Sequence, residues 1–430
     1  WAAINVSACS GFMYNTVSSF NSAGAAGLPA DCLAKFSYSN DGLGGCSGFQ
    51  ASFVGNMAPQ AFAGWTAGCT RVLLSNAFAQ VTAAQFAMIN PTACGGFKYN
   101  TVSNFNPSGA ANLTADCLSQ FSYSNDGLGG CSGFQAPFVG SINPQAFAGW
   151  TAECTSKLPT NAFSQVTSDQ FAAINASACN GFKYNTVSNF PANAALGIKY
   201  ECVSMFSYSS DGIGGCSGFQ PQFVGNMTPQ AFSGFKAECI KKCPSTAFSS
   251  VNSGHLAALL AASCNGFMYN HVSNFPVLSA PGLQLGCLAN FASSGDNLGG
   301  CSGLEERFVG NMMPVTFEGF KDMCIAVAPS TVFSQINSTQ IAHIPPISFP
   351  GLQGTKVSKI PDAAWDGASK SQLFYLTSDA FSGLRVTALK FLINKWKLEL
   401  VNIFTAEQTS RYPLVSASGK LSLNKSHLNS

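Results

Sequence analysis

Apolar residues recur along most of this chain with a 16-residue period. The clearest run consists of residues that each lie 16 positions after the last: Cys301, Phe317, Phe333, Phe349, Trp365 and Phe381. If this residue is position 0 of a coil, positions 3, 8 and 11 are also usually apolar, and position 2 is often glycine. Two apolar pairs spaced i, i+3 favour short helical turns over strands, whose side chains alternate with a period of two.

A longer, 85-residue period contains the shorter one. The stretch that begins at Asp31 returns in closely similar form at Asp116, Glu201 and Gly286. Each repeat consists of four 16-residue coils and one 21-residue coil. Self-similarity of this kind predicts a repeat architecture in which each part packs mainly on its neighbours.

The expected fold is a disulfide-stapled solenoid of short helical turns joined by short extended links. The pattern predicts roughly 23 coils, each covering the apolar face of the next. Because so short a coil can also close as strands, a β-solenoid is the alternative. The expected parts are repeat 1 at 1–85, repeat 2 at 86–170, repeat 3 at 171–255, repeat 4 at 256–340, further coils without cysteine at 341–395, and a cap or assembly tail at 396–430.

Helix-start signals support helical coils. Thr82 to Gln85 and Thr167 to Gln170 have the form of a capping box, in which the first and fourth residues exchange hydrogen bonds. Thr228 is followed by Pro229, and proline is favoured at the first position of a helix.

Two C-terminal stretches resemble the leucine-rich repeat family. Asp379 to Asn394 reads DAFSGLRVTALKFLIN, and Ile360 to Trp365 reads IPDAAW, which is similar to the phrase that precedes it in that family. The 16-residue period is shorter than the family's repeat of about 20 to 29 residues, and a regular asparagine ladder is missing. The resemblance implies an extracellular solenoid and no particular receptor function.

The cysteines predict a regular disulfide pattern. Sixteen of the 17 cysteines occupy four equivalent positions in each repeat. The same 23-residue interval recurs eight times, and equal intervals in a repeating stack imply equal geometry. The predicted pairs are Cys9–Cys32, Cys46–Cys69, Cys94–Cys117, Cys131–Cys154, Cys179–Cys202, Cys216–Cys239, Cys264–Cys287 and Cys301–Cys324. The alternative joins Cys32 to Cys46 and Cys69 to Cys94, with unequal intervals of 14 and 25.

Cys243 has no counterpart in the other repeats, and we expect it to be either a buried thiol or a link to another chain.

The longer coil of each repeat contains a glycine-rich loop. Its five extra residues lie in the stretch SYSNDGLGG of repeat 1 and in the equivalent stretches. The pattern predicts a left-handed turn capped by aspartate. The alternative is a weak calcium site, because aspartate and carbonyl oxygens are calcium ligands. The candidate ligands are Asp41, Asp126, Asp211 and Asp296.

Composition narrows the class of protein. Charged residues are 9% of the chain and the net charge is +2, so we expect no nucleic-acid partner. Apolar runs are short and interrupted, so we expect no membrane span. Seventeen cysteines indicate an oxidising compartment, so we expect an extracellular or secreted protein of the cell surface or wall. A start at Trp1 is what a processed chain would have.

N-linked glycans are expected at some of the six N-x-Ser/Thr triplets. These triplets begin at Asn5, Asn112, Asn175, Asn226, Asn337 and Asn424.

No catalytic motif is recognisable. The four histidines are scattered, and the sequence contains no HExxH, no GxSxG and no phosphate-binding loop. We therefore expect no enzymatic activity and no cofactor.

The expected function is structural. Uniform, cross-linked coils with little charge favour a subunit of an extracellular filament, coat or wall that self-associates head to tail into a homopolymer. The candidate assembly residues are Trp1, Trp396, Leu398, Leu400 and Ile403. The alternative is an extracellular recognition module, such as a lectin, an adhesin or a receptor ectodomain, with carbohydrate as a candidate ligand.

Overall fold

The computed structural model describes residues 1, 4–39, 43–123, 129–208, 214–292 and 299–396. The chain divides into two compact units, Trp1–Gly234 and Phe235–Ser430. We call them the N-terminal and the C-terminal unit and describe each by itself.

Both units consist of short 3₁₀-helices (η) and short α-helices (α). In the N-terminal unit these are η1 Val6–Gly11, α1 Tyr14–Val17, η2 Ser22–Gly27, α2 Ala30–Leu33, η3 Gly45–Gly48, α3 Ala51–Gly55, η4 Pro59–Gly64, α4 Ala67–Arg71, α5 Ala83–Phe86, η5 Pro91–Gly96, α6 Tyr99–Val102, η6 Pro107–Asn112, α7 Ala115–Gln120, η7 Gly130–Gly133, α8 Ala136–Gly140, η8 Pro144–Gly149, α9 Ala152–Thr155, α10 Ser168–Ala173, η9 Ala176–Gly181, α11 Tyr184–Val187, η10 Ala192–Gly197, α12 Tyr200–Met205, η11 Gly215–Gly218, α13 Pro221–Gly225 and α14 Pro229–Phe232.

The C-terminal unit continues the pattern. Its elements are α15 Ala237–Lys242, α16 Ser253–Ala258, η12 Ala261–Gly266, α17 Tyr269–Val272, η13 Val277–Gly282, α18 Leu285–Leu288, η14 Gly300–Gly303, α19 Glu306–Gly310, η15 Pro314–Gly319, α20 Asp322–Val327, α21 Ser338–Ala342, η16 Pro346–Gly351, α22 Gly354–Val357, η17 Asp362–Gly367, α23 Lys370–Phe374, α24 Ser378–Ser382 and α25 Val386–Trp396.

Each 16-residue period produces two elements because an extended link separates its 3₁₀-helix from its α-helix. In η5, Asn90 caps the helix and Pro91 is its first residue, and the helix ends at Gly96. An extended link at Phe97 and Lys98 leads into α6. The capping boxes predicted at Thr82 and Thr167 are both present.

The predicted inward positions are buried. In the period that begins at Phe333, the exposed fractions of Phe333, Ile336, Ile341 and Ile344 are 0%, 3%, 0% and 1%. Aromatic rings at these positions touch along the N-terminal unit. For example, Phe49 lies 5.2 Å from Trp65, and Phe78 lies 4.8 Å from Phe97 (ring centroids). The core of each unit is therefore a column of side chains from successive elements.

The stacking unit differs from the predicted one. Each element packs on the third element before it and the third after it, if the turn at 75–80 and its equivalents at 160–165, 245–250 and 330–335 are counted as elements. For example, η5 contacts α4 and α7, and α7 contacts η8. A turn of the stack therefore contains about three elements. Packing partners lie one such turn apart, as in Thr70 Oγ1, which donates to the Ala93 carbonyl 23 residues later.

The prediction that each 16-residue coil covers the next is therefore wrong. The physical reason is that both halves of the period carry an apolar pair and face inward, so one period supplies two sides of a three-sided turn.

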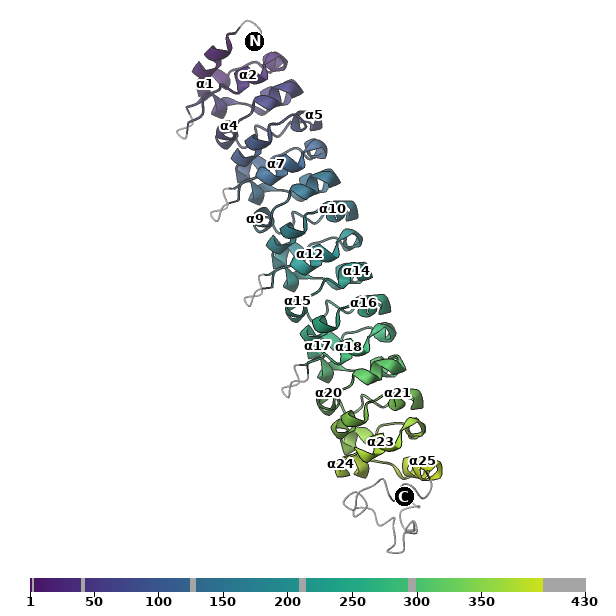
Figure 1. Cartoon of the computed structure of the whole chain (residues 1–430). Helices are drawn as coiled ribbons and strands as arrows, with labels where there is room; N and C mark the ends of the chain where they lie inside the picture. The colour runs from purple at the N-terminus through teal and green to yellow at the C-terminus, as the bar shows by residue number, and fades with distance from the viewer. Residues whose placement is uncertain (2–3, 40–42, 124–128, 209–213, 293–298, 397–430) are drawn as a thin grey trace, which may run out of the picture. The chain divides into compact units, whose positions relative to one another are not determined.

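Equivalent helices of successive repeats lie on the same side of the N-terminal unit. Figure 1 shows α2, α7 and α12 in one row, α4 and α9 in a second, and α5 and α10 in a third. The helices of each row are one repeat apart in the sequence. Residues at equivalent positions of the repeats in this unit are therefore presented on a common face.

No strand occurs among the described residues. The structure contains isolated β-bridges between Met13 and Gly44, Lys98 and Gly129, Lys183 and Gly214, and Met268 and Gly299. Backbone hydrogen bonds run mostly to carbonyls three or four residues earlier, as in short helices. The β-solenoid alternative is not supported. In the same part of the chain, no helix is both long and apolar enough to cross a membrane.

Candidate functional site

Disulfides join one turn of the stack to the next. The structure contains the predicted 23-residue pairs Cys9–Cys32, Cys46–Cys69, Cys94–Cys117, Cys131–Cys154, Cys179–Cys202, Cys264–Cys287 and Cys301–Cys324. The Cα atoms of these pairs lie 5.2 to 5.4 Å apart, within the normal range. Cys216 and Cys239 each take part in a disulfide as well. Each of the seven pairs connects a 3₁₀-helix to the α-helix three elements later, so the bonds clamp consecutive turns.

Buried glutamines connect turns where cysteine is missing. Gln85 Nε2 donates to the carbonyls of Val54, Gly55 and Met57 at 2.8 to 3.3 Å, while its Oε1 accepts from the Thr82 amide. Gln170 and Gln372 make the same contacts in their own turns. One side chain thus caps its own helix and satisfies carbonyls at the end of an earlier one. The core therefore remains fully hydrogen-bonded at these positions.

Cys243 is a buried free thiol. Its Sγ donates to the Cys239 carbonyl at 3.3 Å, and burial raises the pKa of the thiol. Of the two expectations for this cysteine, the buried thiol describes its position in the structure.

His271 occupies a buried position where repeats 2 and 3 have Thr101 and Thr186. Its Nδ1 accepts from the Met268 amide at 3.1 Å, so Nε2 carries the proton and donates to the Cys243 carbonyl at 3.0 Å. Desolvation lowers the pKa of the imidazole, and the hydrogen bond to the Cys243 carbonyl partly opposes this shift. The neighbouring residues thus hold His271 as a neutral hydrogen-bonding group.

Replacement of His271 by threonine is expected to weaken the acid sensitivity of the protein. A histidine whose pKa is lowered in the folded state stabilises fully above the unfolded value of 6.5, and that contribution is lost as the pH falls below it. The wild type should lose more unfolding free energy between pH 7.5 and pH 5 than His271→Thr does. Urea unfolding at both pH values measures this difference, and equal losses in the two proteins would contradict the assignment.

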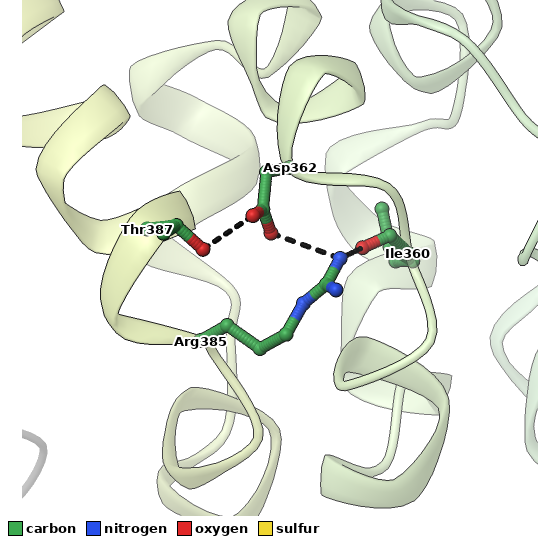
Figure 2. A network of polar contacts seen from close by, with 4 residues as sticks. All are labelled: Ile360, Asp362, Arg385 and Thr387. Carbon is green, nitrogen blue, oxygen red and sulfur yellow. Dashed lines mark hydrogen bonds and ion pairs between the residues drawn. The ribbon is translucent and has the colours of Figure 1, made fainter. Parts of the chain in front are cut away.

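The coils without cysteine use an ionic network instead. Arg385 Nη2 lies 2.9 Å from Asp362 Oδ1 and donates to the Ile360 carbonyl at 2.7 Å, while Thr387 donates to the other carboxylate oxygen of Asp362 (Figure 2). The network ties α25 to η17, which lies three elements earlier. Its charged groups are partly exposed, so we expect a contribution of at most about 1 kcal/mol.

The candidate calcium ligands Asp41, Asp126, Asp211 and Asp296 lie outside the described residues. The base of the first loop is described: Ser37 Oγ donates to the Phe12 carbonyl at 3.2 Å and accepts from the Gly45 amide at 3.1 Å. Next to the equivalent bases, tyrosine side chains are about half exposed. They are Tyr38, Tyr123 and Tyr208 after the serine, and Tyr99, Tyr184 and Tyr269 on the opposite segment.

The described sequon asparagines are exposed, and several cap helices. Asn5 and Asn175 accept the amide two residues later through Oδ1, and the sequon serine donates to the same oxygen. Asn90, which precedes a proline and so cannot be glycosylated, makes the same pair of bonds with Thr92. Helix capping alone therefore accounts for this triplet pattern. Asn112, Asn226 and Asn337 are also exposed, and Asn424 lies outside the described residues.

The candidate assembly residues are only partly described. The ring of Trp1 packs inside its own chain against Phe12, Phe20 and Phe53, with centroids 5.0 to 6.2 Å apart. Trp396 lies beneath the ammonium groups of Lys370 and Lys395. Leu398, Leu400 and Ile403 are outside the described part of the chain.

The three described histidines each bond to the backbone. His255 Nδ1 accepts from the Asn252 amide, and His343 Nδ1 lies 2.7 Å from the Thr339 carbonyl. Within the described residues, no three His, Cys, Asp or Glu side chains are grouped so that they could hold a metal ion.

The exposed apolar side chains of repeat 4 were not among the residues predicted from the sequence. Repeat 4 exposes large apolar side chains at positions where the other repeats are mostly polar or small, among them Leu260, Met313 and Val315. A position-by-position comparison of the four repeats would have revealed the substitutions, although not their exposure.

Comparison of the chain with protein-family models, with curated proteins and with solved structures finds no match.

Proposed function

We propose that this protein is a secreted structural solenoid, a subunit of an extracellular filament, coat or wall that self-associates. The observation that carries the proposal is the regular set of disulfides between consecutive turns. Cross-links at this density are typical of extracellular proteins. They hold a repetitive stack in register at many points, which suits a mechanical role better than a single reactive site.

The proposed role has no catalytic step and no cofactor. Head-to-tail contact between coil stacks is the proposed mode of growth, because elements of repetitive structure can pack on an identical copy as they pack within the chain. N-linked glycans on exposed sequons belong to the same proposal, since a secreted chain passes through the compartment in which they are added.

Electron microscopy of the unreduced protein tests this role. Regular assemblies that persist on dilution and disappear after reduction and alkylation are the expected result. A field of single particles at every concentration would contradict the structural role.

The second candidate is an extracellular recognition module, and the half-exposed tyrosines favour it. Tyr99 and Tyr184 occupy equivalent positions in the N-terminal unit, and their exposed fractions are 46% and 48%. Aromatic rings with neighbouring amide groups, here Asn100 and Asn185, suit stacking against sugar rings. The resemblance of the C-terminal coils to leucine-rich repeats fits this candidate as well. Binding to polysaccharides that is lost in Tyr99→Ser with Tyr184→Ser would favour recognition over structure.

A further inference from the structure

Repeat 4 carries exposed apolar side chains at positions that are mostly polar in the repeats before it. The exposed fractions of Leu260, Met313 and Val315 are 52%, 49% and 47%. The residue equivalent to Leu260 is asparagine in all three earlier repeats, and Val315 replaces glutamine in all three. Met313 stands where repeats 1 to 3 have alanine, asparagine and threonine.

These side chains come from three elements that pack on one another. Leu260 directly precedes η12, Leu285 is the first residue of α18 and is 42% exposed, and Met313 and Val315 flank the start of η15. α18 packs on both η12 and η15. We call Leu260, Leu285, Met313 and Val315 the apolar row.

The earlier repeats show independently that these positions share one surface. In repeat 2, the equivalents of Leu285, Met313 and Val315 are Ala115, Asn143 and Gln145, and all three line a single surface depression of about 550 Å³. In repeat 3, Tyr200, Thr228 and Gln230 line an equivalent depression of about 370 Å³. The same three positions thus converge on one surface in both repeats.

The fold does not require apolar residues in this row. Repeats 2 and 3 form helices at the same places with mostly polar residues. A contiguous exposed apolar patch in a soluble protein marks an interaction site.

A second group of exposed apolar side chains lies on the same unit. Met323, Ile347 and Phe374 are 55%, 72% and 57% exposed, on α20, η16 and α23. η16 packs on both α20 and α23. Met323 replaces the glutamates Glu153 and Glu238, so here too a charged surface position has become apolar.

We propose that the apolar row is the surface through which two copies of this chain associate, each row packing against the row of the other copy. The proposal rests on the proposed self-association and names its contact. The members of the row are uncharged, so pairing two identical rows buries no unpaired charge. Glu318 and Lys321 are exposed, carry opposite charges and come shortly after Val315 in the sequence. In a two-fold arrangement, Glu318 of one copy can face Lys321 of the other.

Restriction of the row to repeat 4 also determines the kind of assembly. A surface present once per chain joins chains in pairs, whereas a surface in every repeat would join them at several registers. The row therefore links two copies side by side, in addition to any contact between coil ends.

Sedimentation velocity of the full-length, unreduced chain over a concentration series tests the proposal. The test variant combines Leu260→Asn, Leu285→Ala, Met313→Asn and Val315→Gln, which are the residues that repeat 2 has at these positions. The wild type should shift from 44.8 kDa toward twice that mass, and the variant should require at least 100-fold higher concentration to do so. An unchanged circular dichroism spectrum shows that the variant is folded.

A matched control uses exposed leucines outside the row. Leu196 and Leu278 are 63% and 87% exposed, and Leu196→Ser with Leu278→Ser should leave the dimer unchanged. A gain-of-contact variant provides the reverse test: Asn175→Leu, Thr228→Met and Gln230→Val, introduced into the four-substitution variant, should restore association through repeat 3.

The outcomes separate this proposal from the proposed function. A wild type that remains monomeric overturns the proposal, and binding of that monomer to phosphatidylcholine vesicles would assign the row to a lipid surface. Ordered assemblies that are equally abundant in the wild type and the four-substitution variant overturn the row while the structural role stands. A dimer that requires the row but forms no larger assembly supports the row and contradicts the filament.

Discussion

Replacing Cys94 and Cys117 together by alanine is expected to lower the free energy of unfolding by about 3 kcal/mol. The bond closes a loop between residues 23 positions apart, and without it the unfolded chain gains the conformational freedom of that loop. Cys94 lies on η5 and Cys117 on α7, both completely buried, so the bond holds two consecutive turns against each other.

The loss should also change how the protein unfolds. In a stack of repeats, stability is the sum of local terms and of the contacts between neighbours. Removal of one clamp in the middle of the N-terminal unit weakens a single contact and allows the two sides to unfold separately. Urea titration followed by circular dichroism should therefore show a lower midpoint and a broader transition.

The matched control is Cys243→Ala, which removes a buried sulfur and no disulfide. It should cost clearly less than the loss of the Cys94–Cys117 pair. Equal midpoints for the wild type and the double variant would contradict the assigned role of the disulfides.

Replacing Gly197 by alanine is expected to destabilise the protein by about 3 kcal/mol, at the upper end of overpacking effects. A Cβ atom at Gly197 would lie 1.7 Å from the Ser168 carbonyl oxygen, which belongs to the first residue of α10. α10 packs directly on η10, which ends at Gly197. An added methyl group would force the two turns apart, because backbone atoms cannot move aside as a flexible side chain can.

Gly11 provides the control, because it occupies the same position of its coil. A Cβ atom there would meet nothing within 4 Å. Gly11→Ala should therefore leave stability unchanged or raise it slightly through the unfolded state. Thermal unfolding of the two variants measures the contrast, and a similar loss in both would contradict close packing at Gly197 as the cause of the effect.

Much of the local structure was predictable from the sequence. The positions of Phe333, Ile336, Ile341 and Ile344 in the 16-residue period correctly identify buried residues, because an apolar i, i+3 pair marks the inner side of a helical turn. The capping boxes at Thr82 and Thr167 were predictable for the same reason: their hydrogen bonds are local.

The number of elements in a turn was not predictable from the period. A sequence repeat records how often the same environment returns, and here a 3₁₀-helix and an α-helix can occupy contacting places in consecutive turns. Elements as different as η5 and α7 therefore pack on each other one turn apart. The 23-residue interval between cysteines carried this information, since it measures a contact between turns directly.

The apolar row was not predictable from the sequence for a related reason. Leu283 and Leu285 are both leucines and lie close together in the sequence, yet their exposed fractions are 1% and 42%. Only the three-dimensional packing of α18 distinguishes the core position from the surface position. The sequon pattern has two explanations that the sequence alone does not separate, since Asn5 and Asn175 also cap helices.

The pairing of the cysteines determines how the turns of the stack lie on one another. Peptide mapping by mass spectrometry, on protein that has been alkylated and digested without reduction, identifies the linked peptides. We predict bonds between cysteines 23 residues apart, including Cys9–Cys32 and Cys46–Cys69, and Cys243 recovered as a free thiol. Peptides that link Cys32 to Cys46 and Cys69 to Cys94 would contradict the stacking and with it the proposed structural role.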